Sequence, residues 1–60
     1  MLNKTDLKAF QTRIDVICDH TFGRLDDDGH LCLDGYFTPG QMIELGKIMV
    51  EVHRTIMEGG

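Results

Sequence analysis

Two cysteines and two nearby histidines are the residues of this chain best suited to binding a metal ion. Cys18 and His20 form one pair, and His30 and Cys32 form the other. Thiolates and imidazoles are the ligands that zinc prefers. On a helix, residues two apart point about 200° from each other, so Cys18 and His20 face one ion only where the helix has ended, whereas on a strand His30 and Cys32 share a face. The spacing is poor for zinc, so a small zinc-binding module using Cys18, His30 and Cys32 is only the alternative hypothesis.

Acid–base chemistry has a weaker basis in this sequence. Asp15, Asp19 and His20 could be combined into a catalytic set, but any short polar helix offers similar residues. The sequence contains no glycine-rich phosphate loop, no nucleophile elbow and no HExxH motif. A chain of 60 residues also has little volume with which to enclose a pocket. We therefore expect a protein that is not an enzyme and that needs no cofactor.

Composition and charge exclude two broad classes of partner. The formal net charge is −4, and the six basic residues are scattered, whereas nucleic-acid binding needs a basic patch. No apolar run approaches the roughly 18 residues that span a bilayer. No apolar leader follows Met1, which predicts a cytoplasmic protein with reduced thiols. The length predicts a single small domain over residues 1–60.

The first predicted element is a helix over about residues 5–22. Thr5 is a candidate N-cap, and Gly23 is a candidate stop after the last turn. Apolar and small side chains recur at spacings of three and four, which predicts one buried stripe. The stripe consists of Leu7, Phe10, Ile14, Ile17 and Thr21, with Cys18 beside it.

The second predicted helix spans about residues 38–57 and has the clearer start signal. Thr38 and Gln41 form a capping box, with Pro39 at the first helical position. The connection over 23–37 contains turn signals at 26–29 and at 34–35, and His30 to Leu33 reads as a short strand. The predicted fold is mainly all-α: a helical hairpin with a turn-rich or β-hairpin-like connection, paired with a second copy into a four-helix homodimer.

The second helix carries more apolar surface than one partner helix can cover. At about 100° per residue its apolar arc spans roughly 220°, and an ordinary surface helix needs little more than about 100°. One seam contains Leu45, Ile48, Val52 and Ile56, and the adjacent seam contains a helical glycine, Gly46, where another backbone could approach closely. We predict that a partner binds the adjacent seam with two aromatic residues at its rim. These residues are Tyr36, Phe37, Met42, Gly46, Met49, Val50, His53 and Met57.

The sequence favours a regulatory protein that acts by protein–protein interaction. Free-standing acidic chains of this size are frequent among bacterial and phage regulators, so we expect an adaptor or inhibitor that occludes a larger protein. The uncovered seam also predicts a homo-oligomer, most simply a dimer. The alternatives are the zinc-binding module and a structural subunit of a larger assembly.

Overall fold

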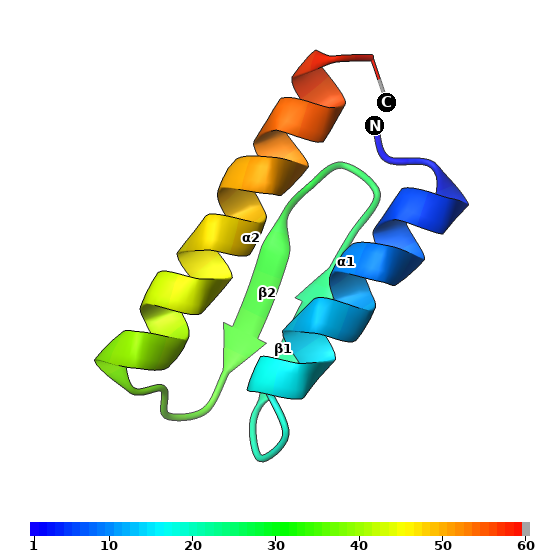
Figure 1. Ribbon diagram of the computed structural model, residues 1–60. Coiled ribbons are helices and arrows are strands. Elements are labelled where there is room, and N and C mark those ends of the chain that lie inside the picture. The colour runs from blue at the N-terminus through cyan, green and yellow to red at the C-terminus, as the bar shows by residue number, and fades with distance from the viewer. Residues whose placement is uncertain (60) are drawn as a thin grey trace.

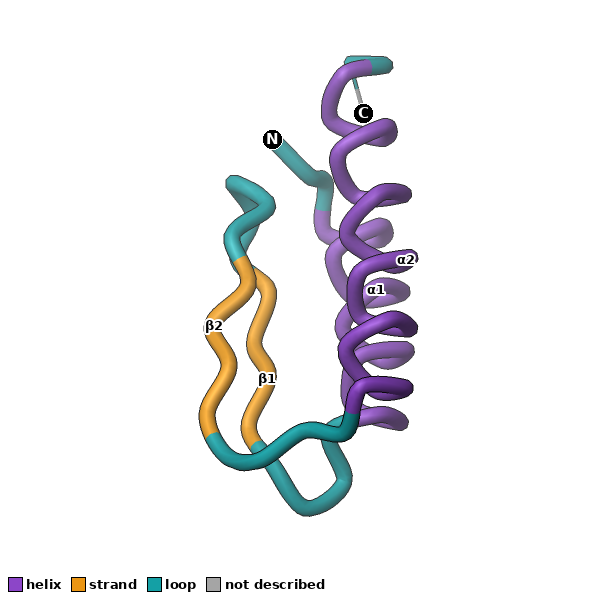
Figure 2. The backbone as a smooth tube through the Cα atoms, turned by 90° about the vertical axis from the view of Figure 1, so that its left-hand side faces the viewer, coloured by secondary structure: helices purple, strands orange, loops and turns teal. Residues whose placement is uncertain are grey.

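The computed structural model describes residues 1–59 and contains two helices and two strands. Along the chain, the elements are α1 (Lys4–Ile17), β1 (Phe22–Leu25), β2 (Leu31–Asp34) and α2 (Pro39–Met57). The two helices run antiparallel in one layer, and the two strands form an antiparallel hairpin in a second layer beneath them (Figures 1 and 2). Every described strand residue therefore lies on one side of the helix pair.

The predicted all-α helical hairpin is wrong, because the structure also contains a two-stranded antiparallel sheet. Pairing with a second copy stays a prediction. The first helix ends at Ile17, about five residues earlier than predicted, with Cys18 as its C-cap. Phe22–Leu25 instead pairs with Leu31–Asp34. The helical spacing of apolar residues continues in the sequence as far as Thr21, but the chain bends after Cys18, and from Phe22 onward the backbone pairs with β2. Pairing between distant residues leaves no periodic signal in a segment of four residues.

The hairpin turn lies at Asp26–His30, which is the first of the two turn signals in the connection. One carboxylate oxygen of Asp26 accepts hydrogen bonds from the backbone N–H groups of His30 (2.8 Å) and Asp28 (3.0 Å). Gly29 adopts a φ of 88°, a conformation that favours glycine. The N–H of His30 is the main cause of the lowered pKa of Asp26, because it stabilises the charged carboxylate. The acidic cluster that the sequence marked as a turn therefore closes β1 onto β2.

Gly23 allows β1 to lie directly against α1. A Cβ atom at this position would lie 2.7 Å from Cys18 Sγ and 3.0 Å from Ile14 Cγ2, both closer than ordinary packing permits. The residue predicted as a helix stop is thus a strand residue whose missing side chain makes room for the helix. The Gln11 side chain reinforces the contact, because its Nε2 donates to the Gly23 carbonyl (2.9 Å) and its Oε1 accepts from the Leu25 N–H (2.8 Å).

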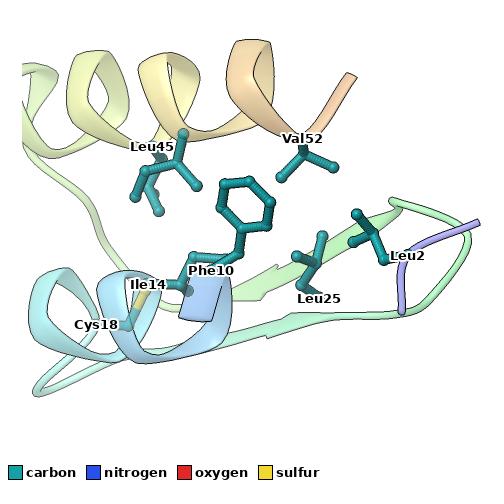
Figure 3. Packing of buried hydrophobic residues seen from close by; sticks show 8 residues of the cluster. Leu2, Phe10, Ile14, Cys18, Leu25, Leu45 and Val52 are labelled. Atoms are coloured by element: carbon teal, nitrogen blue, oxygen red, sulfur yellow. The ribbon is translucent and has the colours of Figure 1, made fainter. Parts of the chain in front are cut away.

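The core lies between the two layers, with Phe10 directed toward α2 (Figure 3). Residues alternate along the strands, so Leu25, Leu31 and Leu33 face the helices and the other strand face is exposed. The buried apolar residues come from both helices, β1 and the N-terminal segment. They are Leu2, Phe10, Ile14, Cys18, Leu25, Leu45, Ile48 and Val52.

The helix starts show how local chemistry sets the boundaries. The predicted capping box of α2 is formed: Thr38 Oγ1 accepts from the Gln41 N–H (3.1 Å), and Gln41 Oε1 accepts from the Thr38 N–H (2.8 Å). The predicted Thr5 cap of α1 is wrong. Asn3 is the N-cap instead, and its Oδ1 accepts from the Asp6 N–H (2.8 Å).

Gly23→Ala should destabilise the protein by about 1 to 3 kcal/mol, the usual cost of overpacking a core. The added methyl group would collide with Cys18 and Ile14. The matched control is Gly46→Ala, where a Cβ meets nothing within 4 Å. That control should stabilise the protein by up to about 1 kcal/mol through helix propensity. Urea denaturation of both variants tests this pair, and equal effects would contradict the close approach of β1 to α1.

Thr38→Ala should lower the free energy of unfolding by about 1 kcal/mol, because the Gln41 N–H would lose its acceptor. Thr5→Ala is the internal comparison. Thr5 lies inside α1 and not at its cap, so its replacement should change stability by no more than a few tenths of a kcal/mol. The measurement is the denaturation midpoint of each variant. A larger decrease for Thr5→Ala than for Thr38→Ala would contradict the observed helix starts.

Candidate partner-binding surface

The second helix presents two apolar surfaces with different environments. Leu45, Ile48 and Val52 face α1 and the hairpin, and they are 1–4% exposed. The adjacent surface, here called the α2 flank, points away from α1. It consists of Met42, Ile43, Gly46, Met49, Val50, His53 and Met57. The two seams expected from the helical periodicity therefore exist, and the structure shows which of them the chain covers.

The α2 flank is largely uncovered. Met42, Ile43, Val50 and Met57 are 47%, 60%, 55% and 71% exposed. Gly46 and His53 are also exposed, whereas Met49 is partly buried against the core. The flank is thus a continuous strip that extends from Met49, which packs against the core, to side chains that are exposed to solvent. Such a strip is the kind of apolar surface that marks an interaction site.

The two aromatic residues expected at the rim of the surface differ in their environments. Tyr36 lies in the link between β2 and α2 and is 99% exposed. Phe37, the next residue, is partly buried and packs against the core. Tyr36 is therefore free to contact a partner, whereas Phe37 anchors the start of α2. No side chain of the described residues fills the space above Gly46.

The polar side of α2 is occupied by ion pairs. Arg13 on α1 makes a two-point contact with the Glu51 carboxylate, through Nη2 to Oε2 (2.7 Å) and Nη1 to Oε1 (3.0 Å). This contact raises the pKa of Arg13 and lowers the pKa of Glu51, because each charge is stabilised by the other. Lys47 pairs with Glu44 at 3.0 Å. These residues line an open groove of about 340 Å³ between the helices, which is too shallow to enclose a ligand.

The candidate metal ligands are dispersed. Cys18 is buried in the core, and Cys32 is exposed on the outer face of the hairpin. His20 and His30 are exposed and lie beside Asp19 (3.8 Å) and Asp26 (3.5 Å) respectively. Within residues 1–59, no three His, Cys, Asp or Glu side chains gather in a group suited to a metal ion. The arrangement offers no support to the zinc alternative.

The three residues considered for acid–base chemistry are all exposed on the surface. Asp15 accepts a hydrogen bond from Gln11 Nε2 at 2.8 Å. The Asp19 and His20 side chains are 66% and 92% exposed. Water therefore surrounds the only acid–histidine contact of this group, which is a poor environment for general acid–base catalysis.

Across residues 1–59, no helix combines the length and apolarity that crossing a membrane requires.

Sequence reasoning missed one feature beside the flank, which is the outer edge of β2. Leu31 and Leu33 appeared in the sequence only as the apolar residues of a short strand. Whether their backbone groups are paired or free depends on the register with β1. No residue type signals that register, and only the placement of β1 shows which edge stays open.

No protein-family model, curated protein sequence or solved structure matches this chain.

One thiol per native chain should react rapidly with a thiol reagent. Cys32 is exposed and Cys18 is buried, so the second thiol should react only on unfolding. Absorbance titration with Ellman's reagent, with and without denaturant, measures both classes. Cys32→Ser should abolish the fast phase. Rapid reaction of two thiols in the folded protein would show that Cys18 is not enclosed by α1, β1 and α2.

Proposed function

We propose that this chain is a non-enzymatic interaction protein that binds a larger protein through the α2 flank and regulates or inhibits it by occlusion. The observation that carries the proposal is the exposure of four large apolar side chains along one side of a well-capped helix: Met42, Ile43, Val50 and Met57. A helix held by a capping box and a core-facing stripe presents such a surface in a defined orientation.

The chemistry of the flank suits protein recognition. Methionine side chains adapt to irregular partners, and methionine and tyrosine are enriched in interface cores. Met42, Met57 and the fully exposed Tyr36 supply such groups. The flank itself carries no carboxylate or ammonium group, so its burial does not require the removal of fixed charges from water.

Two further expectations concern the state of the chain. Self-association stays a prediction, which light scattering at micromolar concentration tests. A role as a permanent subunit of a larger assembly would use the same surface. Co-purification from the native host distinguishes the two roles, because a regulator is also recovered free of its target.

Val50→Asp should weaken partner binding at least tenfold and leave the fold intact, because this side chain is 55% exposed and lies in the middle of the flank. Val16→Asp is the matched control, since Val16 is a 77% exposed valine on α1 outside the flank. The measurement is the affinity for the co-purified partner, with circular dichroism as the check on folding. Equal loss in both variants would point to a general effect of charge.

Gly46→Leu should separate binding from folding more sharply. A side chain at Gly46 enters open space, so the free energy of unfolding should rise by up to about 1 kcal/mol from helix propensity. The same side chain should lower the affinity for the partner by occupying the contact surface. Unchanged affinity in a more stable variant would remove Gly46 from the interface.

A further inference from the structure

The hydrogen-bond pattern of the hairpin shows which backbone groups point outward. Hydrogen-bonded and non-hydrogen-bonded pairs alternate along an antiparallel ladder. The Asp26 N–H donates to the His30 carbonyl (3.0 Å), so the next pair, Leu25 and Leu31, is a non-hydrogen-bonded one. The Gln11 contacts agree, because they reach the Leu25 N–H and the Gly23 carbonyl from the outer side of β1.

The same alternation directs the N–H and C=O groups of Leu31 and Leu33 toward the outer side of β2. Among residues 1–59, no hydrogen bond reaches these four groups. Figure 2 looks at the molecule from this side, and no other segment crosses in front of β2. The chain therefore covers the edge of β1 with Gln11 and leaves the edge of β2 open. An open edge is a template for an additional strand.

One side of the α2 flank lies over the space next to the outer edge of β2. Packed helices lie about 8–10 Å apart and neighbouring strands about 4.7–4.9 Å apart, so two helices cover the width of about four strands. The hairpin supplies two strands: β1 passes behind α1, and β2 lies between the two helices (Figure 1). At about 100° per residue, Met42, Met49 and His53 lie next to the core stripe on the side away from α1. They are the residues that would face a third strand.

Most of the charged side chains near the open edge are acidic, and the exception is Arg24, which lies opposite Cys32 on the exposed face of β1. Residues 25–46 contain no lysine or arginine, whereas Asp26, Asp27, Asp28 and Asp34 lie at the two ends of β2. Asp34 is on the exposed face of the hairpin together with Cys32. A strand that pairs with Leu31 and Leu33 alternates between this face and the face beneath α2. Basic side chains on the exposed face would be attracted to these carboxylates.

We propose that an extended segment of the partner protein adds to β2 as a third strand, with apolar side chains beneath the α2 flank and basic side chains on the exposed face. This inference rests on the proposed function, because it specifies how the partner engages the flank. A second copy of the chain fits poorly. Antiparallel pairing of two β2 strands places both helix layers on the same face of the sheet, with the two strands about 4.8 Å apart. Each α2 would then lie over the β2 strand of the other copy, and the two α2 helices would overlap because packed helices need about 8–10 Å between their axes.

The test uses synthetic octapeptides as probes and a chain made by chemical synthesis. The first probe alternates valine and lysine, and the second alternates valine and glutamate. The valine–lysine peptide should shift the amide NMR signals of Leu31 and Leu33 and slow their exchange with solvent. Its affinity should exceed that of the valine–glutamate peptide at least tenfold, and the difference should shrink at high salt. No binding of the valine–lysine peptide at millimolar concentration would overturn the proposal.

Methylation of the Leu33 backbone nitrogen removes one outward donor without touching the ladder to β1, and it should lower the affinity for this peptide at least tenfold. Methylation of the Gly40 nitrogen is the control, because this N–H lies in the first turn of α2, where no intrahelical acceptor exists. Circular dichroism checks that both chains fold. If the Leu33 modification unfolds the chain, Asp34→Lys replaces it and should reverse the preference between the two peptides.

Three outcomes distinguish this proposal from the function on which it rests. Unchanged peptide affinity after Leu33 methylation overturns strand addition. If Val50→Asp still weakens binding of the co-purified partner in that case, the α2 flank remains the binding surface. Protection of the Leu31 and Leu33 amides in concentrated protein without any peptide would identify a second copy as the occupant, and would overturn the proposed partner segment.

Discussion

The contact between Gln11 and the edge of β1 determines where the hairpin lies. One side-chain amide donates to the Gly23 carbonyl and accepts from the Leu25 N–H, as a neighbouring strand would. The absence of a side chain at Gly23 lets the strand come close enough for both bonds, beside Ile14 and Cys18. With β1 held in this way, the register of the hairpin turns Leu25, Leu31 and Leu33 toward the helices. The placement of α2 follows, because Leu45, Ile48 and Val52 close over the same core.

The two surfaces proposed to bind a partner have one physical origin, which is the difference in width between the layers. Two strands are narrower than two helices, and the hairpin is drawn toward α1 by Gln11 and Gly23. The uncovered part of the helix layer is therefore the far side of α2, and the uncovered part of the sheet is the outer edge of β2. A partner segment that fills the gap would satisfy backbone groups and bury apolar side chains together.

The charge distribution separates structural ion pairs from the surface available to a partner. The two-point contact of Arg13 with Glu51 and the Lys47–Glu44 pair all lie on the polar side of α2, away from the flank. The basic residues closest in sequence to the open edge are Arg24 and Lys47, and the segment between them is acidic. Apart from Arg24, which lies opposite Cys32 on β1, the charged side chains around β2 are acidic, whereas the α2 flank carries no charged side chain. The edge of β2 would therefore favour a basic segment, and the α2 flank would favour an apolar one.

The sequence by itself determined α2, its capping box and its two apolar seams, because these depend on residues three and four positions apart in one element. It also identified Asp26 to Gly29 as a turn, since the Asp26 carboxylate bonds to backbone groups only two and four residues away. It did not determine the end of α1, the existence of β1 or the role of Gly23. Those depend on contacts between residues that are distant along the chain, such as Gln11 with Leu25 and Phe22 with Asp34. Only the tertiary structure decided which seam of α2 is covered and which strand edge is open, because side-chain type does not encode how two layers of unequal width are aligned.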